Sequence, residues 1–364
     1  MPKYRKLIRL AGILLSLPLV IVATPGLTQQ NSLNFIFGIS GDVQIKRDGR
    51  NSYQQVYIGT LLNPSDRLRL GKGSSAKVFC NNLSTWNITS QGEFSVSSGC
   101  PSTEKAILIR NGSNRVDTRT PNDPTIPYII SPRDTAILND KLNLRWNVVK
   151  GATSYQVLLR GPGVNWTTQV KQPEVTYSGK ETLQPGSRYR VIVTADNGVS
   201  SENETPTGFT LLSEENAKRV KAEITQLEKQ SLTNESKILA LAYLYKSNNL
   251  NAAAIDLLAG LVKQGNQTTA VYQLLGSLYQ QVGLNRLAKE QYVTALKLAK
   301  AEKNLEAQAI IQASLGEIDI TLDNLQQAFE SLQAAQSGYR TLGDEQQVQQ
   351  LQQKLDDLTG RLSS

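Results

Sequence analysis

The chain has 364 residues, of which 39 are Lys or Arg, 31 are Asp or Glu, two are Cys and none is His. This length corresponds to about two or three domains, and a hydrophobic share of 39 % allows each of them a core. Without His, a Ser-His-Asp triad, a Cys-His pair and His-ligated zinc are excluded. Two Cys cannot form a four-thiolate metal or iron–sulfur site. We therefore expect no enzyme activity, no cofactor and no metal.

The first 28 residues have the pattern of an export signal. Four basic residues precede Leu10–Ala23, a mostly apolar run without charges, and the Thr/Pro/Gly-containing stretch Thr24–Thr28 follows. The run is shorter than the roughly 20 residues of a membrane span. The pattern predicts a signal peptide over residues 1–28 and a periplasmic or extracellular location. The cleavage site is imperfect, and an uncleaved segment would instead anchor the chain in the membrane.

The net charge of +8 includes the four basic residues of the signal segment, which leaves +4 for the rest of the chain. So small a charge does not indicate a nucleic-acid partner. The two cysteines, Cys80 and Cys100, fit an exported chain, because oxidising compartments favour disulfides. We predict that they form one.

Residues 29–120 have the alternating pattern of short strands. Polar and apolar residues alternate in Asp42–Lys46 and Arg67–Leu70, and Ala76–Cys80 and Ala106–Arg110 are further short strands. Gly and Asn pairs lie between them. A small all-β sandwich or barrel is the expected outcome.

The order of these motifs resembles the periplasmic FecR-type domain. The matching motifs are Gly41–Ile45, Gly59–Leu62 and Asp66–Leu70, followed by a strand that enters a turn at Asn81–Asn82. FecR-type regulators also have a cytoplasmic anti-sigma segment, but only nine residues precede the apolar run here. The resemblance therefore implies the domain without the signalling role.

Residues 121–127 contain three prolines and predict a stiff linker. Residues 128–212 form a second β region, with strands expected at Leu142–Trp146, Ser154–Leu158, Tyr189–Val193 and Gly208–Leu212. The region resembles a fibronectin type III domain. The resemblance implies that Trp146 is the core tryptophan and that Tyr189 bonds to upstream backbone, because Leu183, Pro185, Gly186 and Tyr189 match the tyrosine corner.

Trp166 lies outside this pattern, in a loop or edge near Gly161–Gly163. It is either a partly buried edge aromatic or a stacking platform for a glycan or a partner. The second interpretation supports an alternative function for the β domains, which is binding of cell-wall polysaccharide.

The hydrophobic pattern of residues 213–364 has the helical period of 3.6, and this region contains no proline. Small anchor residues recur at Ala242, Gly276 and Gly316, with spacings of 34 and 40, and each has an alanine twelve residues later. The pattern resembles the tetratricopeptide repeat, in which small residues let two helices approach closely. The last apolar stripe, from Val348 to Leu358, predicts a helix that caps the solenoid.

The resemblance places the first helix of each repeat on a concave binding face. The expected groove residues are Tyr243, Lys246, Gln273, Ser277, Gln280 and Glu317. Because this face is nearly uncharged, a protein or peptide partner would be bound by amides and Tyr; a solvated face without a ligand is the alternative.

The three-part chain resembles uncharacterised envelope proteins of cyanobacteria. We expect a multidomain, exported, non-enzymatic scaffold with two all-β domains followed by an α-helical solenoid. An envelope sensor is the alternative if the N-terminus stays in the membrane.

Overall fold

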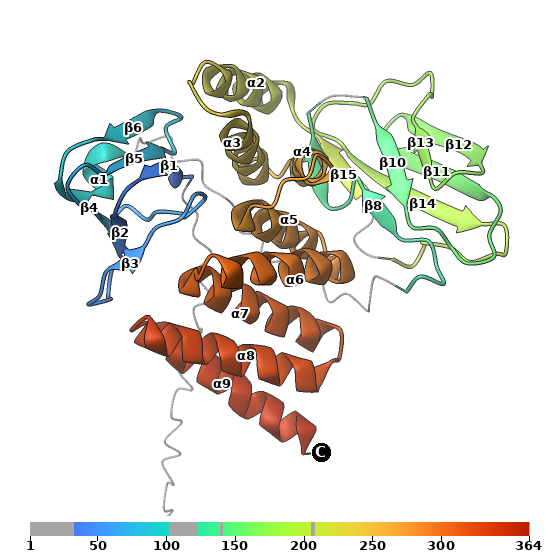
Figure 1. Ribbon diagram of the computed structural model, residues 1–364. Coiled ribbons are helices and arrows are strands. Elements are labelled where there is room, and N and C mark those ends of the chain that lie inside the picture. Colours follow the sequence, from blue (N-terminus) through green and yellow to red (C-terminus); the bar gives the residue numbers. More distant parts are fainter. Residues whose placement is uncertain (1–32, 102–122, 139–140, 205–207, 364) are drawn as a thin grey trace, which may run out of the picture.

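A computed structural model describes residues 33–101, 123–138, 141–204 and 208–363. Two β-domains are followed by a run of helices, as the sequence predicted (Figure 1). The predicted signal segment and the predicted strand Ala106–Arg110 lie outside the described residues. Within them, no helix is long and apolar enough to cross a bilayer.

The first β domain consists of two small antiparallel sheets. One sheet has the order β1 (Phe35–Ser40), β5 (Ser75–Phe79), β6 (Thr85–Ile88), and the other has the order β3 (Gln54–Gln55), β2 (Val43–Lys46), β4 (Arg67–Leu70), β7 (Gly92–Ser95). Alternation directs Val43, Ile45, Leu68 and Leu70 into the space between the sheets. The predicted disulfide is confirmed: Cys80 after β5 is bonded to Cys100, which follows the short helix α1 (Val96–Gly99).

The second β domain is a sandwich of a three-stranded and a five-stranded sheet. The first has the order β13 (Glu174–Thr176), β10 (Asn143–Trp146), β8 (Ile129–Ser131), and the second has the order β12 (Val164–Val170), β11 (Tyr155–Gly161), β14 (Arg188–Ala195), β15 (Gly208–Leu211), β9 (Thr135–Ile137). Trp146 is buried between them, edge-on to Tyr155. The Tyr189 hydroxyl accepts a hydrogen bond from the Gln184 backbone N–H, five residues upstream, at 2.7 Å. Both contacts expected of these two aromatic residues are therefore present.

The C-terminal part is a solenoid of antiparallel helix hairpins. Its helices are α2 (Glu214–Glu228), α3 (Asn234–Ser247), α4 (Asn251–Lys263), α5 (Thr269–Gln281), α6 (Asn285–Ala301), α7 (Leu305–Thr321), α8 (Leu325–Thr341) and α9 (Glu345–Leu362). The hairpins α3–α4, α5–α6 and α7–α8 stack in chain order, and α9 covers the last one (Figure 1). This is the tetratricopeptide-like arrangement that the repeat predicted.

The turns between these helices share one backbone conformation. Each of α3 to α8 is followed by a residue with positive φ, and the next N–H bonds back to the carbonyl five residues earlier, which closes the last helical turn. These residues are Asn249, Gly265, Gly283, Lys303, Asp323 and Gly343.

The anchor residues lie where two helices of one hairpin touch. A Cβ on Gly276 would lie 3.0 Å from the Tyr292 ring, and one on Gly316 would lie 2.4 Å from Leu332. The longer spacing before Gly316 has a structural cause. Helix α6 has 17 residues where α4 has 13, and α7 begins four residues further ahead of its anchor than α5 does, whereas the α6–α7 loop is two residues shorter than the α4–α5 loop.

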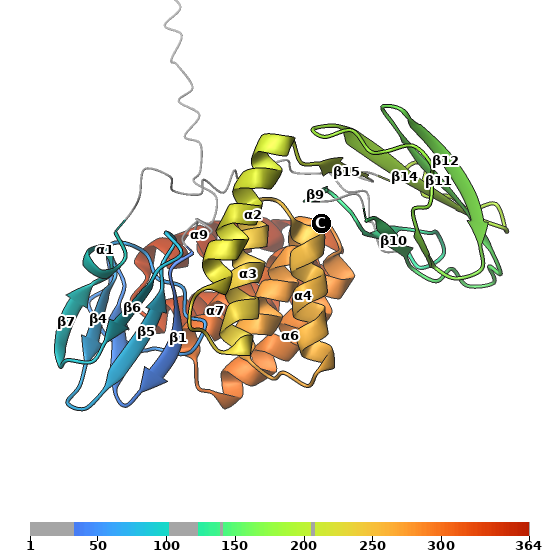
Figure 2. The same cartoon turned by 90° about the horizontal axis from the view of Figure 1, so that it is seen from above.

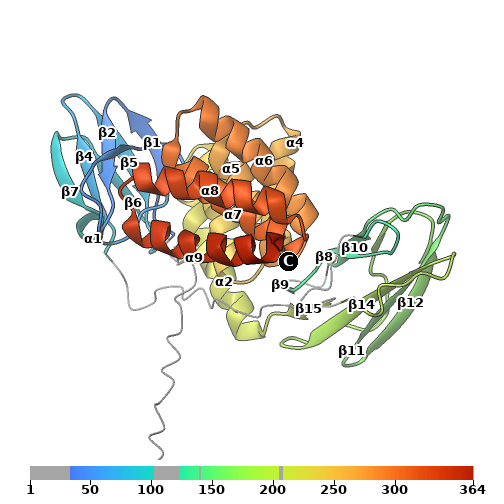
Figure 3. The same cartoon turned by 90° about the horizontal axis from the view of Figure 1, so that it is seen from below.

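The two β domains lie at opposite ends of the first helices of the hairpins. The first β domain lies along α3, α5 and α7, whereas the second lies beyond the turns that follow α3 and α5 (Figures 2 and 3). Both domains therefore contact the same solenoid, and the contact of the first covers part of the predicted groove.

Candidate functional site

The A-helix face is the name used here for the surface formed by α3, α5 and α7. The predicted groove residue Tyr243 is half-buried on this face, and its ring lies 5.6 Å, centroid to centroid, from the ring of Phe35 in β1. Burial raises the pKa of the Tyr243 hydroxyl above its usual value. The structure thus places the first β domain over Tyr243, where the sequence suggested an open groove.

Three other predicted groove residues, Lys246, Ser277 and Gln280, form two separate pairs and not one cluster. Lys246 on α3 donates a hydrogen bond of 2.7 Å to the Ser277 hydroxyl on α5, and burial lowers the pKa of Lys246 to about 8. Gln280 accepts a hydrogen bond from Tyr292 of α6 at 3.2 Å.

Two further groove predictions lie apart from these pairs. Glu317 on α7 is paired with Lys354 on α9. Gln273 on α5 is half-buried. The A-helix face therefore keeps half-exposed amide groups beside the part that the β domain covers.

The first β domain contacts this face through the outer side of its β1–β5–β6 sheet. Ile36 points into the domain core, whereas Phe35, Phe37 and Phe79 pack with residues of α3, α4 and α5. Strand β1 is consequently buried on both faces over its first half, which is unusual for a strand of a free-standing sandwich. The run Asn34-Phe35-Ile36-Phe37 was the sequence signal for this contact, and the sequence interpretation missed it.

The approach of the two surfaces depends on one glycine. Gly59 has φ of +86°, and a Cβ at this position would lie 2.1 Å from the Cβ of Ala270 at the start of α5. Two hydrogen bonds extend the contact: Gln226 of α2 donates to the Asn82 carbonyl, and Ser236 of α3 donates to the Phe37 carbonyl. The domain is held by specific contacts along several helices.

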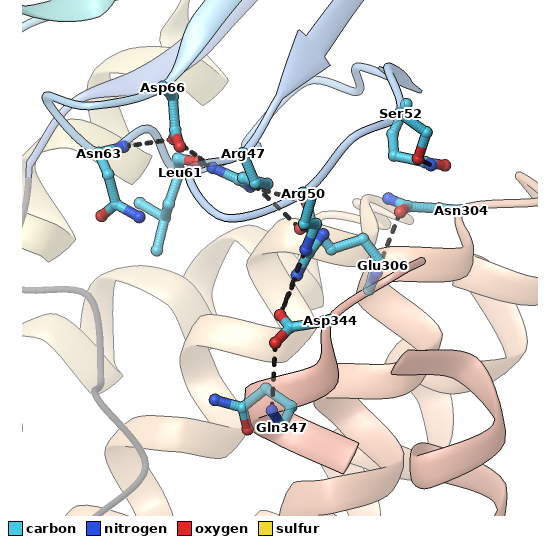
Figure 4. Close-up of polar contacts among 12 residues, drawn as sticks. Arg47, Arg50, Ser52, Leu61, Asn63, Asp66, Asn304, Glu306, Asp344 and Gln347 are labelled. Carbon is cyan, nitrogen blue, oxygen red and sulfur yellow. Dashed lines mark hydrogen bonds and ion pairs between the residues drawn. The ribbon is translucent and has the colours of Figure 1, made fainter. Parts of the chain in front are cut away.

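The strongest polar contact is a group of four charged residues, here called the arginine clasp: Arg47, Arg50, Glu306 and Asp344 (Figure 4). Arg47 donates two hydrogen bonds to Glu306, Nε–Oε1 at 3.0 Å and Nη2–Oε2 at 2.7 Å. Arg50 joins Glu306 to Asp344, with Nη1–Oε1 of 2.8 Å and Nη2–Oδ2 of 2.6 Å. Two-point bonding of this kind needs the planar guanidinium group.

Arg47 is also fixed within its own domain. It donates to Asp66, at 2.6 Å, and to the Leu61 carbonyl, at 2.8 Å. Asp66 is fully buried and accepts a further hydrogen bond from the Asn63 N–H. Contacts within its own domain therefore orient Arg47 toward the helices. The side-chain contacts of Arg50 in the clasp go to Glu306 and Asp344.

The clasp strongly favours the ionised form of its central carboxylate. Burial alone would raise the pKa of Glu306, but the charges and hydrogen bonds of Arg47 and Arg50 outweigh it and hold the pKa at about 2. Burial acts on Arg47 in the opposite direction, and the Glu306 and Asp66 carboxylates still raise its pKa above the usual value. The charges of Arg47 and Glu306 are thus fixed over the physiological pH range.

Helix geometry explains where the two carboxylates lie. Glu306 is in the first turn of α7, which Asn304 caps by accepting from the Ala307 N–H, and Asp344 itself caps α9 by accepting from the Gln347 N–H. Negative side chains are stabilised at helix N-termini. The turn that carries Glu306 is part of the extra length of α7 relative to α5, so the longer repeat spacing supplies this residue.

The second β domain is attached to the turns at the other end of the A helices. The Ala136 N–H donates to the Asn249 carbonyl at 2.7 Å, and Arg133 donates from Nε to the Val282 carbonyl at 2.8 Å. Arg133 is fully buried and also pairs with Glu204 at 2.7 Å. Glu204 thus orients Arg133 within the second β domain, and the bond from Arg133 to the Val282 carbonyl joins that domain to the turn after α5.

A hollow of about 600 Å³ opens where the first β domain meets the start of α3. The domain contributes Phe37 and Ile58, and the solenoid contributes Leu261, the start of the α4–α5 loop (264–266) and the N-terminus of α3. Because its walls come from two domains, its shape depends on their contact.

Trp166 lies in the edge strand β12, on the same side of the strand as the buried Val164. Its half-buried ring is edge-on to Tyr177, with centroids 5.2 Å apart. This geometry is that of an edge aromatic facing the interior of the sandwich.

No group of His, Cys, Asp and Glu side chains in the described part of the chain is arranged to hold a metal ion. The four clasp residues were not among the predicted site residues. The basic turn at 46–50 has the composition of an ordinary solvated hairpin, and nothing local shows that it meets a helix 259 positions away.

No family model and no curated protein matches this chain. Among solved structures, the chain is similar to PcrH in complex with the chaperone binding region of PopD, with 16 % identity, a TM-score of 0.32, and coverage of 36 % of this chain and 98 % of that one. It is also similar to the type III secretion translocator chaperone SycD of Yersinia enterocolitica, with 15 % identity, a TM-score of 0.33, and coverage of 39 % and 94 %.

A third similar structure is MamA, with 15 % identity, a TM-score of 0.29, and coverage of 41 % of this chain and 85 % of that one. With scores this low, the likeness indicates no function. The assignment of the solenoid depends on its own hairpins and turns.

Proposed function

We propose that this protein is a non-enzymatic scaffold of the cell envelope, which binds a protein partner through its solenoid. The observation that carries the proposal is that one solenoid holds two β domains at opposite ends of the same helices. A chain without His also lacks the most common acid–base group of enzymes. Attachment of several modules to one solenoid, without a reaction centre, is what a scaffold requires.

We infer further that the first β domain is FecR-like and that the second is fibronectin type III-like. The second inference is supported by the division into three and five strands and by the bond between Tyr189 and the Gln184 backbone. The first is supported by the two short sheets, in which β2 and β4 coincide with the motifs of the resemblance.

The proposed location depends on the N-terminal sequence and the disulfide. The apolar run follows a basic segment, and Cys80 and Cys100 are joined, as expected for an oxidising compartment. Mass spectrometry of the mature N-terminus tests this proposal. A start near residue 24 or 29 supports a released protein, whereas an intact N-terminus supports a tethered one and the role of an envelope sensor.

Position-specific photo-crosslinking in living cells tests partner binding. A photo-reactive amino acid replaces Gln273 or Gln280 on the A-helix face, and the matched controls replace the exposed Val293 or Lys297 on α6. We expect a discrete protein adduct from the first two positions and none from the controls. Adducts from all four positions alike, or from none, would contradict binding through this face.

A further inference from the structure

The A-helix face already has an occupant, which is the first β domain of the same chain. Phe35 lies against Tyr243, and the loop at Gly59 lies directly against Ala270. Leu239 of α3 is 2 % exposed within the same cluster. The aromatic and aliphatic side chains of this face are therefore covered by a domain that lies more than 130 positions earlier in the chain.

At the edge of the same contact, the β domain and the helices carry opposite charges. The β domain contributes two cations, Arg47 and Arg50, and the helices contribute two anions, Glu306 and Asp344. All four are largely buried, with exposed fractions of 7, 8, 15 and 19 %. If the domain left the face, the carboxylates would remain at two helix N-termini beside an apolar surface.

We propose that the first β domain is an exchangeable occupant of the A-helix face, and that a partner protein takes its place by presenting two arginines beside an apolar side chain. This inference rests on the proposed scaffold function and specifies the partner's chemistry. On this proposal, Glu306 and Asp344 are the carboxylates that pair with the partner's arginines.

The chemistry of the helix side makes an arginine pair the best match. Glu306 accepts from two guanidinium groups at once, and Asp344 accepts two hydrogen bonds from Arg50. An ammonium group cannot form such a two-point bond with a carboxylate. A partner with only apolar side chains would leave the two largely buried anions unpaired, which is strongly unfavourable.

Exchange is feasible for a partner that reproduces both the charged and the apolar parts of this contact. The attraction within a buried ion pair largely offsets the cost of removing the charges from water, so the net gain from the pair itself is small. Replacing one arginine pair by another therefore changes the free energy little. The tether gives the β domain a high effective concentration, so a partner shifts the equilibrium only by binding the open face more tightly.

Two variants of the full chain open the contact by different routes. Arg50→Glu places a like charge against Glu306 and Asp344, and Ala270→Trp inserts a large ring where Gly59 now lies. The matched control is Arg67→Glu at an exposed position of β4, where Arg67 pairs with Glu93 of its own domain. We expect amide hydrogen exchange in α3 and α5 to rise by about tenfold or more in both variants and to stay unchanged in the control.

Exchange itself is tested by mixing two full-length variants. Glu306→Arg repels the chain's own β domain but leaves its arginine pair intact, whereas Arg50→Glu leaves both helix carboxylates intact. Each variant alone should be a monomer. In the mixture, the β domain of the Glu306→Arg chain should dock on the helices of the Arg50→Glu chain, and light scattering should detect a 1:1 complex.

Either of two results would overturn the proposal. One is unchanged exchange in α3 and α5 of both opening variants. The other is an open state in both variants without a complex in the mixture. Neither result affects the crosslinking at Gln273 and Gln280 in the unaltered protein, so failure of the exchange is distinguishable from failure of the scaffold function.

Discussion

Arg47 and Glu306 form a two-point hydrogen bond although 259 positions separate them in the chain. The bond joins a β-turn of the first domain to the first turn of α7, and Arg50 extends it to the cap of α9. The solenoid is therefore more than a stack of hairpins, because its A-helix face is built to receive the chain's own β domain.

The substitution Glu306→Gln should weaken this contact without changing its shape. The amide leaves two largely buried guanidinium groups without their shared anion, and breaking a buried pair costs about 3 kcal/mol or more. The free energy of opening, measured by hydrogen exchange of β1 and β5, should fall by that amount. Glu302→Gln, at an exposed position just before α7, is the control and should leave the exchange unchanged.

The stability that this contact contributes should also depend on pH, between about pH 2 and pH 4.5. Because the pKa of Glu306 falls from 4.5 to about 2 on folding, the unfolded state binds more protons between these values, and stability falls as pH falls. Above pH 4.5 the contribution is constant, and near pH 2 it is lost. The stability difference between the unaltered chain and Glu306→Gln should therefore be flat at neutral pH and shrink toward zero over this window. A difference that shrinks already at neutral pH would contradict the assignment.

Local sequence patterns predicted those elements whose structure is set by residues close in the sequence. Alternation located β2 and β4, the small anchors located the hairpin contacts at Gly276 and Gly316, and the distance between Cys80 and Cys100 allowed the disulfide. Each of these features is set by residues close in sequence or by a repeat that can be compared with itself.

The contact between the domains could not be predicted in the same way. Arg47 and Arg50 lie in a turn whose charges suit water equally well, and Tyr243 has the same periodicity whether a domain or solvent covers it. Two weak signals existed. One was the run Phe35-Ile36-Phe37, which offers an apolar side chain to both faces of β1, and the other was the six-residue difference between repeat spacings, which adds the turn with Glu306.

Two glycines in the solenoid should respond to alanine in opposite directions. A Cβ on Gly316 would lie 2.4 Å from the side chain of Leu332, which is fully buried and cannot move freely. We expect Gly316→Ala to lower the free energy of unfolding by about 1–3 kcal/mol. Gly260 in α4 has nothing within 4 Å of such a Cβ, so Gly260→Ala should raise it by about 0.5–1 kcal/mol. Urea denaturation followed by circular dichroism measures both, and equal signs would contradict the packing.

The disulfide should stabilise the first β domain, because it closes a loop of the chain and so restricts the unfolded state. Its sequence separation is 20, and a loop of this size corresponds to about 3 kcal/mol in the chain-entropy model. The double variant Cys80→Ala and Cys100→Ala should lose this stability, as measured by hydrogen exchange of β5. A reducing agent should produce the same loss in the unaltered chain and no further loss in the variant.

Lys246 should be a site where removal of a charge stabilises the protein. Burial lowers its pKa from 10.5 to about 8, so the folded state binds fewer protons than the unfolded state between these values, and stability rises with pH there. Below pH 8 the cost of the buried charge is fully present. Lys246→Met should therefore raise the free energy of unfolding at neutral pH by about 1–2 kcal/mol, a value reduced for the half-exposed side chain.

The gain from Lys246→Met should disappear above about pH 10.5, because the lysine of the unaltered chain is then largely neutral in the folded and the unfolded state. Lys221→Met, on the exposed side of α2, is the matched control and should leave the free energy of unfolding nearly unchanged. Urea titrations at several pH values measure both variants. A loss of stability at neutral pH would show instead that the hydrogen bond from Lys246 to Ser277, which joins α3 to α5, outweighs the cost of burying the charge.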